Sequence, residues 1–528
     1  MISDLDPDLT TDQSEDIEVI DTSGLFDTDY YLRSNPDVAK QRMHPLVHFV
    51  RHGADEGRNP NDVFVIQQYL RGRGDSVPPG RNAFAHFIMH GSDDDLFDRG
   101  LLTVFEVPTL RRGIGRLQRL PIYSDEKYLE MNSDVSRLSR PLDEHAFLYG
   151  FPEGRSVLNS LVVAESLGRF ASMDERSRPP PTWATANELA MPTKPAAVYY
   201  NSLGNGFIKE IAEDLVASLA GAGFDAVLLD QTAEIADRRP VSIVMAPHEF
   251  FHLGRGRDWA IDSVVSQAFM FNTEQLQTVW FERGLPFMLM SRGILDICCQ
   301  VASMFDDSGL RALHFSPDIA PPDIDHPNGW LLPADEEHSM IRVLPPAART
   351  TPNPETPFDQ RPIDVSFFGG TSEHREAFFV RHARYLSNLE TYLYYRRFDG
   401  PQKNTKRDGI LSRLGAHVTA HSKISLNIHR DDYGFFEWHR IVKMAMAGGS
   451  VVVTEPCLPH PLFKPDRHFF EESGRHIPDL LEWLLHTDDG RARAEEVRRD
   501  ALALVHDRLT TEQAHRNLRS FLLEGMTA

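Results

Sequence analysis

Cysteine, long apolar runs and positive charge are all scarce in this sequence. Only three of its 528 residues are cysteines, Cys298, Cys299 and Cys457, so no disulfide framework is expected. No stretch approaches the ~18 consecutive apolar residues of a membrane-spanning helix. Lys and Arg number 55 against 77 Asp and Glu, a formal net charge of −22, which excludes a global basic field for nucleic acid or an anionic membrane surface. We therefore expect a reduced, cytoplasmic protein that binds no nucleic acid and makes at most peripheral membrane contact.

The chain is too long for one hydrophobic core, because domains usually contain roughly 100 to 200 residues each. Residues 1–23 are acidic, lack the apolar region of a leader peptide and are expected to form a disordered tail. Residues 176–194 include the run RSRPPPTW, and residues 346–362 are again rich in proline; both are typical of linkers. The predicted folded parts are residues 24–175, 195–345 and 363–528.

The first of these parts contains one sequence unit three times. Each copy has a Tyr-Leu pair, a His 16 residues after the Leu and a Gly 21 residues after it. These residues are Tyr31, Leu32, His48 and Gly53, then Tyr69, Leu70, His86 and Gly91, then Tyr128, Leu129, His145 and Gly150. Each unit predicts two short helices, the second closed by its Gly. No further metal ligand accompanies the His in all three copies, so we interpret it as part of the helix packing.

Residues 26–60 also resemble the short helical repeats, of the form Phe-Asp-x-x-Tyr-Tyr-Leu-x-x-Asn-Pro-Asp-Val, that flank glycosyltransferase domains in bacterial surface-polysaccharide proteins. The resemblance implies an accessory module and leaves its ligand open. We expect this module to position an acceptor or to mediate protein contact or dimerisation.

From residue 195 onward, buried strands alternate with amphipathic helices. AAVYY is followed by a glycine-bearing loop, a helix and the strand FDAVLLD, which predicts a βαβ unit with parallel strands. A second series begins with IDVSFFGG and continues through KISLNIH and SVVVTE. The sequence thus predicts an α/β fold of two Rossmann-like domains preceded by an all-α repeat domain. Ligands of such sheets bind outside the carboxyl ends of the strands, so the chemistry is expected there.

The strand IDVSFFGG ends in Gly369 and Gly370, directly before a helix whose predicted cap is Thr371 or Ser372. The free N–H groups and the positive dipole end of a helix start attract phosphate. Arg375 lies in the first turn and could add a charge. An ordinary strand-to-helix turn is the alternative interpretation.

The segment SKISLNIHRDDYGFFEWHRIVKMAMAGGSVVVTEP adds further cations and carboxylates. Glu437 and Arg440 share one face of a predicted helix, and Arg430 follows the preceding strand. The ribose of a nucleotide needs an acceptor such as a carboxylate, and its diphosphate needs fixed cations, for which Arg is well suited. A surface ion pair between Glu437 and Arg440 is the alternative.

FFGGTSEHRE together with NIHRDDYGFFEWHRIVKMAMAGGSVVVTEPCLPHPLFKPDRHFFE resembles the nucleotide-sugar half of GT-B glycosyltransferases, especially the spore-maturation-type and rhamnan-synthesis-type group. The resemblance covers residues 195–525. Many retaining members of the class have a Glu where this chain has Met444, so recognition of ribose or hexose is expected to fall to Glu437 or Glu455.

This resemblance implies transfer of a hexosyl or deoxyhexosyl group from a nucleoside-diphosphate sugar to a hydroxyl of a bacterial glycan or protein. Cations and a helix start can stabilise the leaving diphosphate, so neither a metal nor a cofactor is expected. The alternative is a catalytically inactive scaffold that only binds nucleotide or glycan.

For the catalytic base, VSIVMAPHEFFHLG places His248 and Glu249 just beyond a strand. A His can accept a proton near pH 7 without any shift, and a Glu only if its pKa is raised. Glu274, after the strand FMFNT, is the third candidate. Asn205 and Gly206 precede the first helix and are expected to let the donor diphosphate or the acceptor approach the backbone. A turn cap and a solvated carboxylate are the alternatives for His248 and Glu249.

Two further acidic positions are not assigned to chemistry. Asp296 lies with the adjacent cysteines in an apolar run that is predicted to be helical, and it is interpreted as core. Asp323 and Asp325 form an Asp-x-Asp pair outside any recognisable strand end, so we do not expect them to bind a metal.

Overall fold

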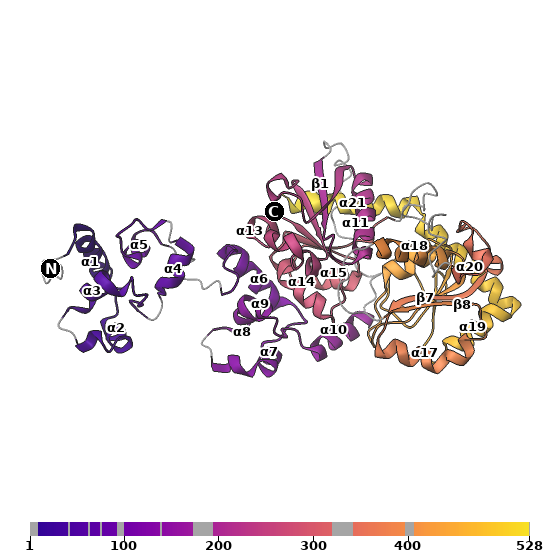
Figure 1. Cartoon of the computed structure of the whole chain (residues 1–528), viewed down its shortest axis with the longest axis horizontal. Coiled ribbons are helices and arrows are strands. Elements are labelled where there is room, and N and C mark those ends of the chain that lie inside the picture. Colours follow the sequence, from indigo (N-terminus) through magenta and orange to yellow (C-terminus); the bar gives the residue numbers. More distant parts are fainter. Residues whose placement is uncertain are drawn as a thin grey trace. The chain divides into compact units, whose positions relative to one another are not determined.

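The computed structural model describes residues 9–40, 43–61, 64–73, 76–91, 100–137, 140–172, 194–318, 342–396 and 406–526. They belong to two compact units, Met1–Arg111 and Arg112–Ala528 (Figure 1). The predicted linker at 176–194, except Lys194, and the Asp323–Asp325 pair lie outside the described residues. Across the described ranges, no helix is both long and apolar enough to span a bilayer.

The acidic N-terminal segment contains a helix, so the prediction of a disordered tail is wrong for residues 11–23. Helix α1 (Thr11–Ser23) begins with a reciprocal cap between Thr10 and Gln13. Its residues Ile17 and Ile20 are buried in the core of the first unit. The buried Asp16 carboxylate contacts the Arg81 guanidinium at 2.7 Å and stabilises α1 against the second repeat. Tertiary packing therefore outweighs the polar composition.

The residues of the three copies form short helices. Copy one consists of α2 (Thr28–Ser34), η2 (Val38–Lys40), α3 (Pro45–His48) and the π-helical turn η3 (Phe49–Gly53), and copy two of α4 (Ile66–Arg73) and α5 (Ala83–His90). Copy three consists of α7 (Asp125–Met131), η6 (Ser133–Arg137), α8 (Leu142–His145), η7 (Ala146–Gly150) and α9 (Phe151–Glu153), flanked by α6 (Val107–Arg119) and α10 (Ser160–Ser172).

A buried Tyr–His pair explains the spacing within each copy. The Tyr hydroxyl and the His Nδ1 are hydrogen-bonded at 3.0 Å in copy one, 2.7 Å in copy two and 2.9 Å in copy three. The glycines of copies one and three leave room for this pair, because a Cβ on Gly53 or Gly150 would collide with the Tyr hydroxyl. The repeated His thus has a partner within the helix packing.

The third copy belongs to the second unit and is attached to its first sheet domain. Arg112, Arg116 and Arg119 of α6 donate hydrogen bonds of 2.8 Å to the carbonyls of Met290, Leu289 and Ser308. These carbonyls close α14 (Val279–Met290) and α15 (Cys299–Asp307), whose last turns lack partners within the helix. Copies one and two lie in the other unit, so the repeats do not form a single compact domain.

The first sheet has six parallel strands in the order β2-β1-β3-β4-β5-β6. The strands are β1 (Lys194–Tyr200), β2 (Phe224–Asp230), β3 (Val241–Met245), β4 (Phe269–Asn272), β5 (Gly293–Asp296) and β6 (Ala312–His314). Besides α14 and α15, this domain contains α11 (Gly206–Gly221), η10 (Ile235–Asp237), α12 (Pro247–Phe250), η11 (Gly254–Trp259) and α13 (Asp262–Val265). The strand order reverses between β1 and β3.

The second sheet has five parallel strands in the order β11-β10-β9-β7-β8. They are β7 (Ile363–Gly370), β8 (Thr391–Arg396), β9 (Ser422–Asn427), β10 (Val451–Thr454) and β11 (Phe470–Glu471). The helical elements are η13 (Pro346–Arg349), η14 (Phe358–Gln360), α17 (Glu373–Leu386), α18 (Lys406–Ala420), the π-helix η15 (His439–Met446), α19 (Ile477–His486), α20 (Asp488–Val505) and α21 (Arg508–Gly525). Here the order reverses between β7 and β9. The predicted α/β fold with two Rossmann-like domains is confirmed.

Contacts of η15 and α21 join the two sheet domains. Ile441 and Met446 of η15 share a buried cluster with residues of β1, β3 and β4. Helix α21 packs against α11, and its Phe521 ring lies 5.6 Å from the Phe269 ring of β4. The two sheet domains are therefore packed against each other through η15 and α21.

Candidate functional site

At the switch point of the first sheet, the predicted residues Asn205 and Glu249 contact each other. The backbone N–H of Asn205 donates to Glu249 Oε2 at 2.9 Å, and its side-chain amide donates to Oε1. Burial raises the pKa of Glu249. Gly204, which the sequence analysis missed, makes this contact possible, because a Cβ there would collide with the carboxylate. Gly206 begins α11 and has open space around it. Both oxygens of Glu249 are thus occupied in holding the loop after β1.

The turn after β3 is strained. Ala246 has a φ of 46° and a ψ of 68°, in the left-handed region that non-glycine residues rarely adopt. Its N–H donates to the Phe271 carbonyl at 2.9 Å, so α12 starts directly at the end of the strand. Nothing in the sequence indicated this conformation.

His248 and Glu274 meet beyond β3 and β4. The His248 Nε2 lies 3.5 Å from Glu274 Oε1, and burial lowers the pKa of His248 to about 3, which keeps its imidazole neutral. Burial and the nearby Glu249 raise the pKa of Glu274 to about 7, although Thr278 and Arg430 act in the opposite direction. Of the three predicted base candidates, Glu274 is the one poised to exchange a proton near neutral pH.

Asn272 holds the backbone of Glu274 through two hydrogen bonds. The Asn272 amide donates to the Glu274 carbonyl at 2.9 Å, and its Oδ1 accepts from the Glu274 N–H at 3.2 Å. The same amide donates to Asp296 at 2.8 Å. Asp296 is fully buried, which agrees with the core interpretation, but it ends strand β5, so the prediction of a helix is wrong at this residue. Burial raises its pKa to about 8.

At the switch point of the second sheet, Arg375 is held in place by backbone carbonyls. Its guanidinium donates to the carbonyls of Ile428 at 2.9 Å and Gly370 at 3.0 Å. The cap of α17 is Ser372 rather than Thr371, since the Ser372 hydroxyl accepts from the Arg375 N–H. Burial, together with Arg440, lowers the pKa of Arg375 to about 10, so it stays charged at neutral pH. Gly369 lies in β7 beside this guanidinium.

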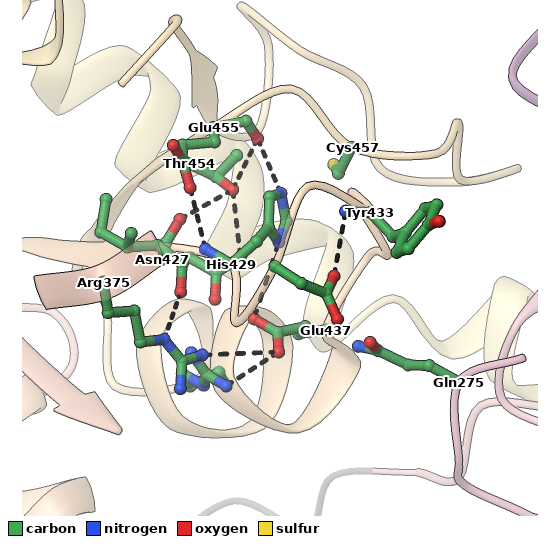
Figure 2. A network of polar contacts seen from close by, with 12 residues as sticks. Gln275, Arg375, Asn427, His429, Tyr433, Glu437, Thr454, Glu455 and Cys457 are labelled. Carbon is green, nitrogen blue, oxygen red and sulfur yellow. Dashed lines mark hydrogen bonds and ion pairs between the residues drawn. The ribbon is translucent and has the colours of Figure 1, made fainter. Parts of the chain in front are cut away.

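Glu437 is surrounded by cationic and imidazole groups (Figure 2). Arg440 Nη2 donates to Glu437 Oε1 at 2.8 Å, and Arg375 Nη2 lies 4.0 Å from the same oxygen. The His429 Nδ1 lies 4.0 Å from Oε2. The Glu437 side chain is only 14% exposed, so its pair with Arg440 is not the surface ion pair considered as the alternative. His429 was missed, although its place at the end of the strand KISLNIH was a usable signal.

Two other residues predicted to bind the donor, Glu455 and Arg430, have different surroundings. Glu455 accepts from His374 at 2.9 Å and from the His429 N–H at 2.9 Å, so its carboxylate is already occupied. Arg430 is exposed and acts on the site through its attraction on Glu274. Met444, where many relatives of the resembled class have Glu, packs its methyl group against Gly415 of α18.

Unpaired buried polar atoms mark the space around both switch points. Among the described residues, the side-chain atoms here that lack a hydrogen-bond partner include Arg375 Nη2, Arg440 Nη1, His429 Nδ1, Asn427 Oδ1 and Glu437 Oε2 in the second domain, and His248 Nδ1, Thr273 Oγ1 and Gln277 Oε1 in the first. An unpaired buried polar group costs about 1–3 kcal/mol, so such a concentration indicates a ligand site. Within the same described ranges, no three His, Cys, Asp or Glu side chains are grouped as metal ligands would be.

The two clusters face each other across the domain boundary. Gln277, on the turn after β4, donates from Nε2 to Asp431 Oδ2 at 3.1 Å, and Asp431 follows β9 in the second domain. Gln275 of the same turn lies opposite the Glu437 cluster in Figure 2. One ligand could therefore contact both domains.

No family model and no curated protein matches the sequence. Among solved structures, T4 phage BGT in complex with UDP and Mn²⁺ is 11% identical, with 62% of this chain and 99% of that chain covered and a TM-score of 0.37. Anabaena HepE in complex with UDP-glucose is 12% identical, with 62% and 99% covered and a TM-score of 0.35. An α1,3-fucosyltransferase with GDP-fucose is 10% identical, with 65% and 96% covered and a TM-score of 0.29. Likeness at these scores carries no argument about activity, which depends on the residues of this chain.

Proposed function

We propose that the chain is a glycosyltransferase that moves a hexosyl or deoxyhexosyl group from a nucleoside-diphosphate sugar to a hydroxyl of a bacterial glycan or protein. The observation that carries the proposal is the set of unpaired buried polar atoms at two facing switch points. Switch points are where open α/β sheets bind their ligands. The resemblance of residues 367–376 and 427–471 to the nucleotide-sugar half of GT-B enzymes supports the same assignment.

On the donor side, Arg375 and Arg440 bind the diphosphate, together with the N-terminus of α17. Two fixed guanidinium groups can neutralise the leaving group, so the proposal includes no metal. Glu437 Oε2 accepts a hydrogen bond from a hydroxyl of the ribose or the sugar, because this oxygen is unpaired among the described residues. Glu455 is not assigned this role, since His374 and His429 occupy it.

On the acceptor side, Glu274 is the general base. With a pKa of about 7, it is substantially ionised at neutral pH and can take the proton of the acceptor hydroxyl. The acceptor oxygen forms a bond to C1 of the sugar, the bond from C1 to the diphosphate oxygen breaks, and the diphosphate leaves with that electron pair. A single displacement of this kind inverts the configuration at C1. His248, neutral and 3.5 Å away, helps to orient the Glu274 carboxylate.

The test of the donor site is thermal unfolding of the full chain with UDP, GDP and dTDP, with and without EDTA. A ligand at about 100 times its dissociation constant stabilises the folded protein by roughly 2.7 kcal/mol. We expect one nucleotide to raise the melting temperature equally in both conditions and to lose most of this effect in Arg440→Ala. Arg467→Ala is the matched control, because Arg467 is 71% exposed and pairs only at the surface with Asp500.

The results separate the transferase from the scaffold alternative. A stabilising nucleotide whose sugar derivative is never cleaved, with or without acceptors, would favour an inactive binding scaffold. No stabilisation by any of the three nucleotides would refute the donor site. A shift that disappears with EDTA would refute the metal-independent part of the proposal.

A further inference from the structure

Gln277, on the turn after β4, contacts the second domain and is not used in the reaction described above. Gln277 Nε2 donates to Asp431 Oδ1 at 3.3 Å, to Asp431 Oδ2 at 3.1 Å and to Gln275 Oε1 at 2.9 Å. Three acceptor oxygens therefore surround this end of the amide. The reversed orientation would place the carbonyl oxygen against a carboxylate, so the assignment of the amide is fixed by its partners.

This orientation leaves Gln277 Oε1 as a hydrogen-bond acceptor. The atom is buried and has no partner among the described residues. An amide oxygen can only accept, so whatever lies beside it has to donate a hydrogen bond. Thr273 Oγ1, on the same turn and likewise unpaired within the described ranges, can accept or donate.

Gln277 is close in the chain to the proposed base and contacts the second domain through Asp431. It lies three residues after Glu274, whose carboxylate accepts from Thr278 of the same turn at 3.3 Å. Its partner Asp431 follows Arg430, the cation that acts on Glu274. Gln277 thus belongs to the turn that carries the proposed base and contacts, through Asp431, the loop that leads from β9 to the donor cluster. In a displacement at C1, the transferred sugar lies between the base and the diphosphate.

The charge around this position restricts the sugar. Glu274, Asp431 and Glu437 contribute carboxylates. The cations Arg375 and Arg440 pair with Glu437 and bind the diphosphate in the proposed reaction, and Arg430 is exposed to solvent. A sugar with hydroxyl groups can donate to these oxygens. A sugar with its own carboxylate would bring a like charge next to Asp431 and Gln277 Oε1, which is unfavourable.

We propose that Gln277 determines donor specificity: its Oε1 accepts a hydrogen bond from a hydroxyl of the transferred sugar, so the site takes neutral hydroxyl-bearing sugars and rejects uronates. This inference rests on the proposed function. It assigns a contact with the donor sugar to the first domain, and it makes that contact dependent on the bridge between Gln277 and Asp431.

The experiment is calorimetric titration of the full chain with the diphosphate that the stability screen selects, its neutral hexose derivative and its uronate derivative, for example UDP, UDP-glucose and UDP-glucuronate. We expect the wild type to bind the uronate at least about 10-fold more weakly than the hexose. Gln277→Met, similar in size but without hydrogen-bonding groups, should weaken binding of the hexose derivative roughly 3- to 10-fold and leave binding of the diphosphate unchanged.

Gln513→Met is the control, because Gln513 is exposed on α21 and should change none of the three affinities. Equal losses for diphosphate and hexose derivative in Gln277→Met would show a structural role and overturn the inference, as would equal affinity of the wild type for hexose and uronate. An unchanged affinity of Gln277→Met for the hexose derivative would also overturn it. If no nucleotide binds at all, the proposed function fails first, and this inference fails with it.

Discussion

At the scale of single residues, three ionisable side chains at the end of the first sheet have different chemistry because their surroundings differ. Glu249 has both oxygens occupied by Asn205. His248 is kept neutral by burial. Glu274 has one hydroxyl partner, Thr278, and a pKa of about 7. The sequence identified all three candidates, but the choice among them depends on contacts between residues far apart in the chain.

The ionisation of Glu274 should be visible in the pH dependence of the transfer activity. Since its folded pKa is raised to about 7, transfer activity should rise with pH and level off above that value, as the carboxylate ionises. Glu274→Gln should lower kcat by about 10²- to 10⁴-fold and remove this ionisation from the pH profile of kcat/KM. Turnover of the donor with a saturating acceptor, measured from pH 5.5 to 9, checks both expectations.

The stability of the same variant gives an independent result. A group whose folded pKa is raised contributes stability that is present at low pH and is lost as the pH rises through the folded pKa. Glu274→Gln should therefore unfold at a temperature equal to or above that of the wild type at pH 8. A variant that is inactive and also clearly less stable at pH 8 would indicate a structural role and contradict the assignment of the base.

At the scale of elements, α6 illustrates how neighbouring glycines can have opposite roles. The helix carries Gly113 and Gly115 in its interior. A Cβ at Gly113 would collide with the ring of Phe147, the core residue of the third repeat, whereas a Cβ at Gly115 would meet open space. Gly113 thus allows α6 to approach the repeat, and Gly115 only weakens the helix.

Alanine substitutions at Gly113 and Gly115 should therefore have opposite effects on stability. Gly115→Ala should stabilise the protein by about 0.5–1 kcal/mol, because Gly in a helix interior is less favourable than Ala by that amount. Gly113→Ala should destabilise it by about 1–3 kcal/mol through overpacking. Urea unfolding of the full chain, followed by circular dichroism, measures both. Equal effects of the two substitutions would show that α6 and the repeat are not packed as described.

At the scale of the whole molecule, the sequence was sufficient for the alternation of strands and helices in both sheet domains. It did not reveal β5, β6 and β8, nor the contacts that complete the site. The strand ends could be located because the buried run VSIVMA stops at Pro247 and the run IDVSFFGG ends in Gly369 and Gly370. The sequence could not show that Glu455 is occupied by His374, or that Gln277 reaches Asp431, because these partners are brought together only by the fold. The error at α1 has the same origin, since Asp16 and Arg81 form a pair across 65 residues.

The two sheet domains are joined by two side-chain pairs with matching spacing, a hydrogen bond and an ion pair. Glu210 and Asp214 lie one turn apart on α11, and His439 and Lys443 lie one turn apart on η15. His439 Nε2 contacts Glu210 at 3.0 Å, and Lys443 Nζ pairs with Asp214. Burial raises the pKa of Asp214 to about 6, although Lys443 counteracts this. Loss of Lys443 would leave a buried carboxylate without its cation.

Replacing Lys443 should therefore lower stability in a way that depends on the ionisation of Asp214. Lys443→Ala should destabilise the protein by about 2 kcal/mol at pH 8, less than for a fully buried pair because Lys443 is partly exposed. The effect should shrink at pH 5, where the Asp214 of the variant takes up a proton and its carboxyl group becomes neutral. Lys209→Ala is the control, since Lys209 forms an exposed pair with Glu213 on the same helix. Urea unfolding at both pH values measures the difference. A loss of stability in Lys443→Ala that is the same at pH 5 and pH 8 would contradict the role of Asp214, because only the ionised carboxylate needs the lysine.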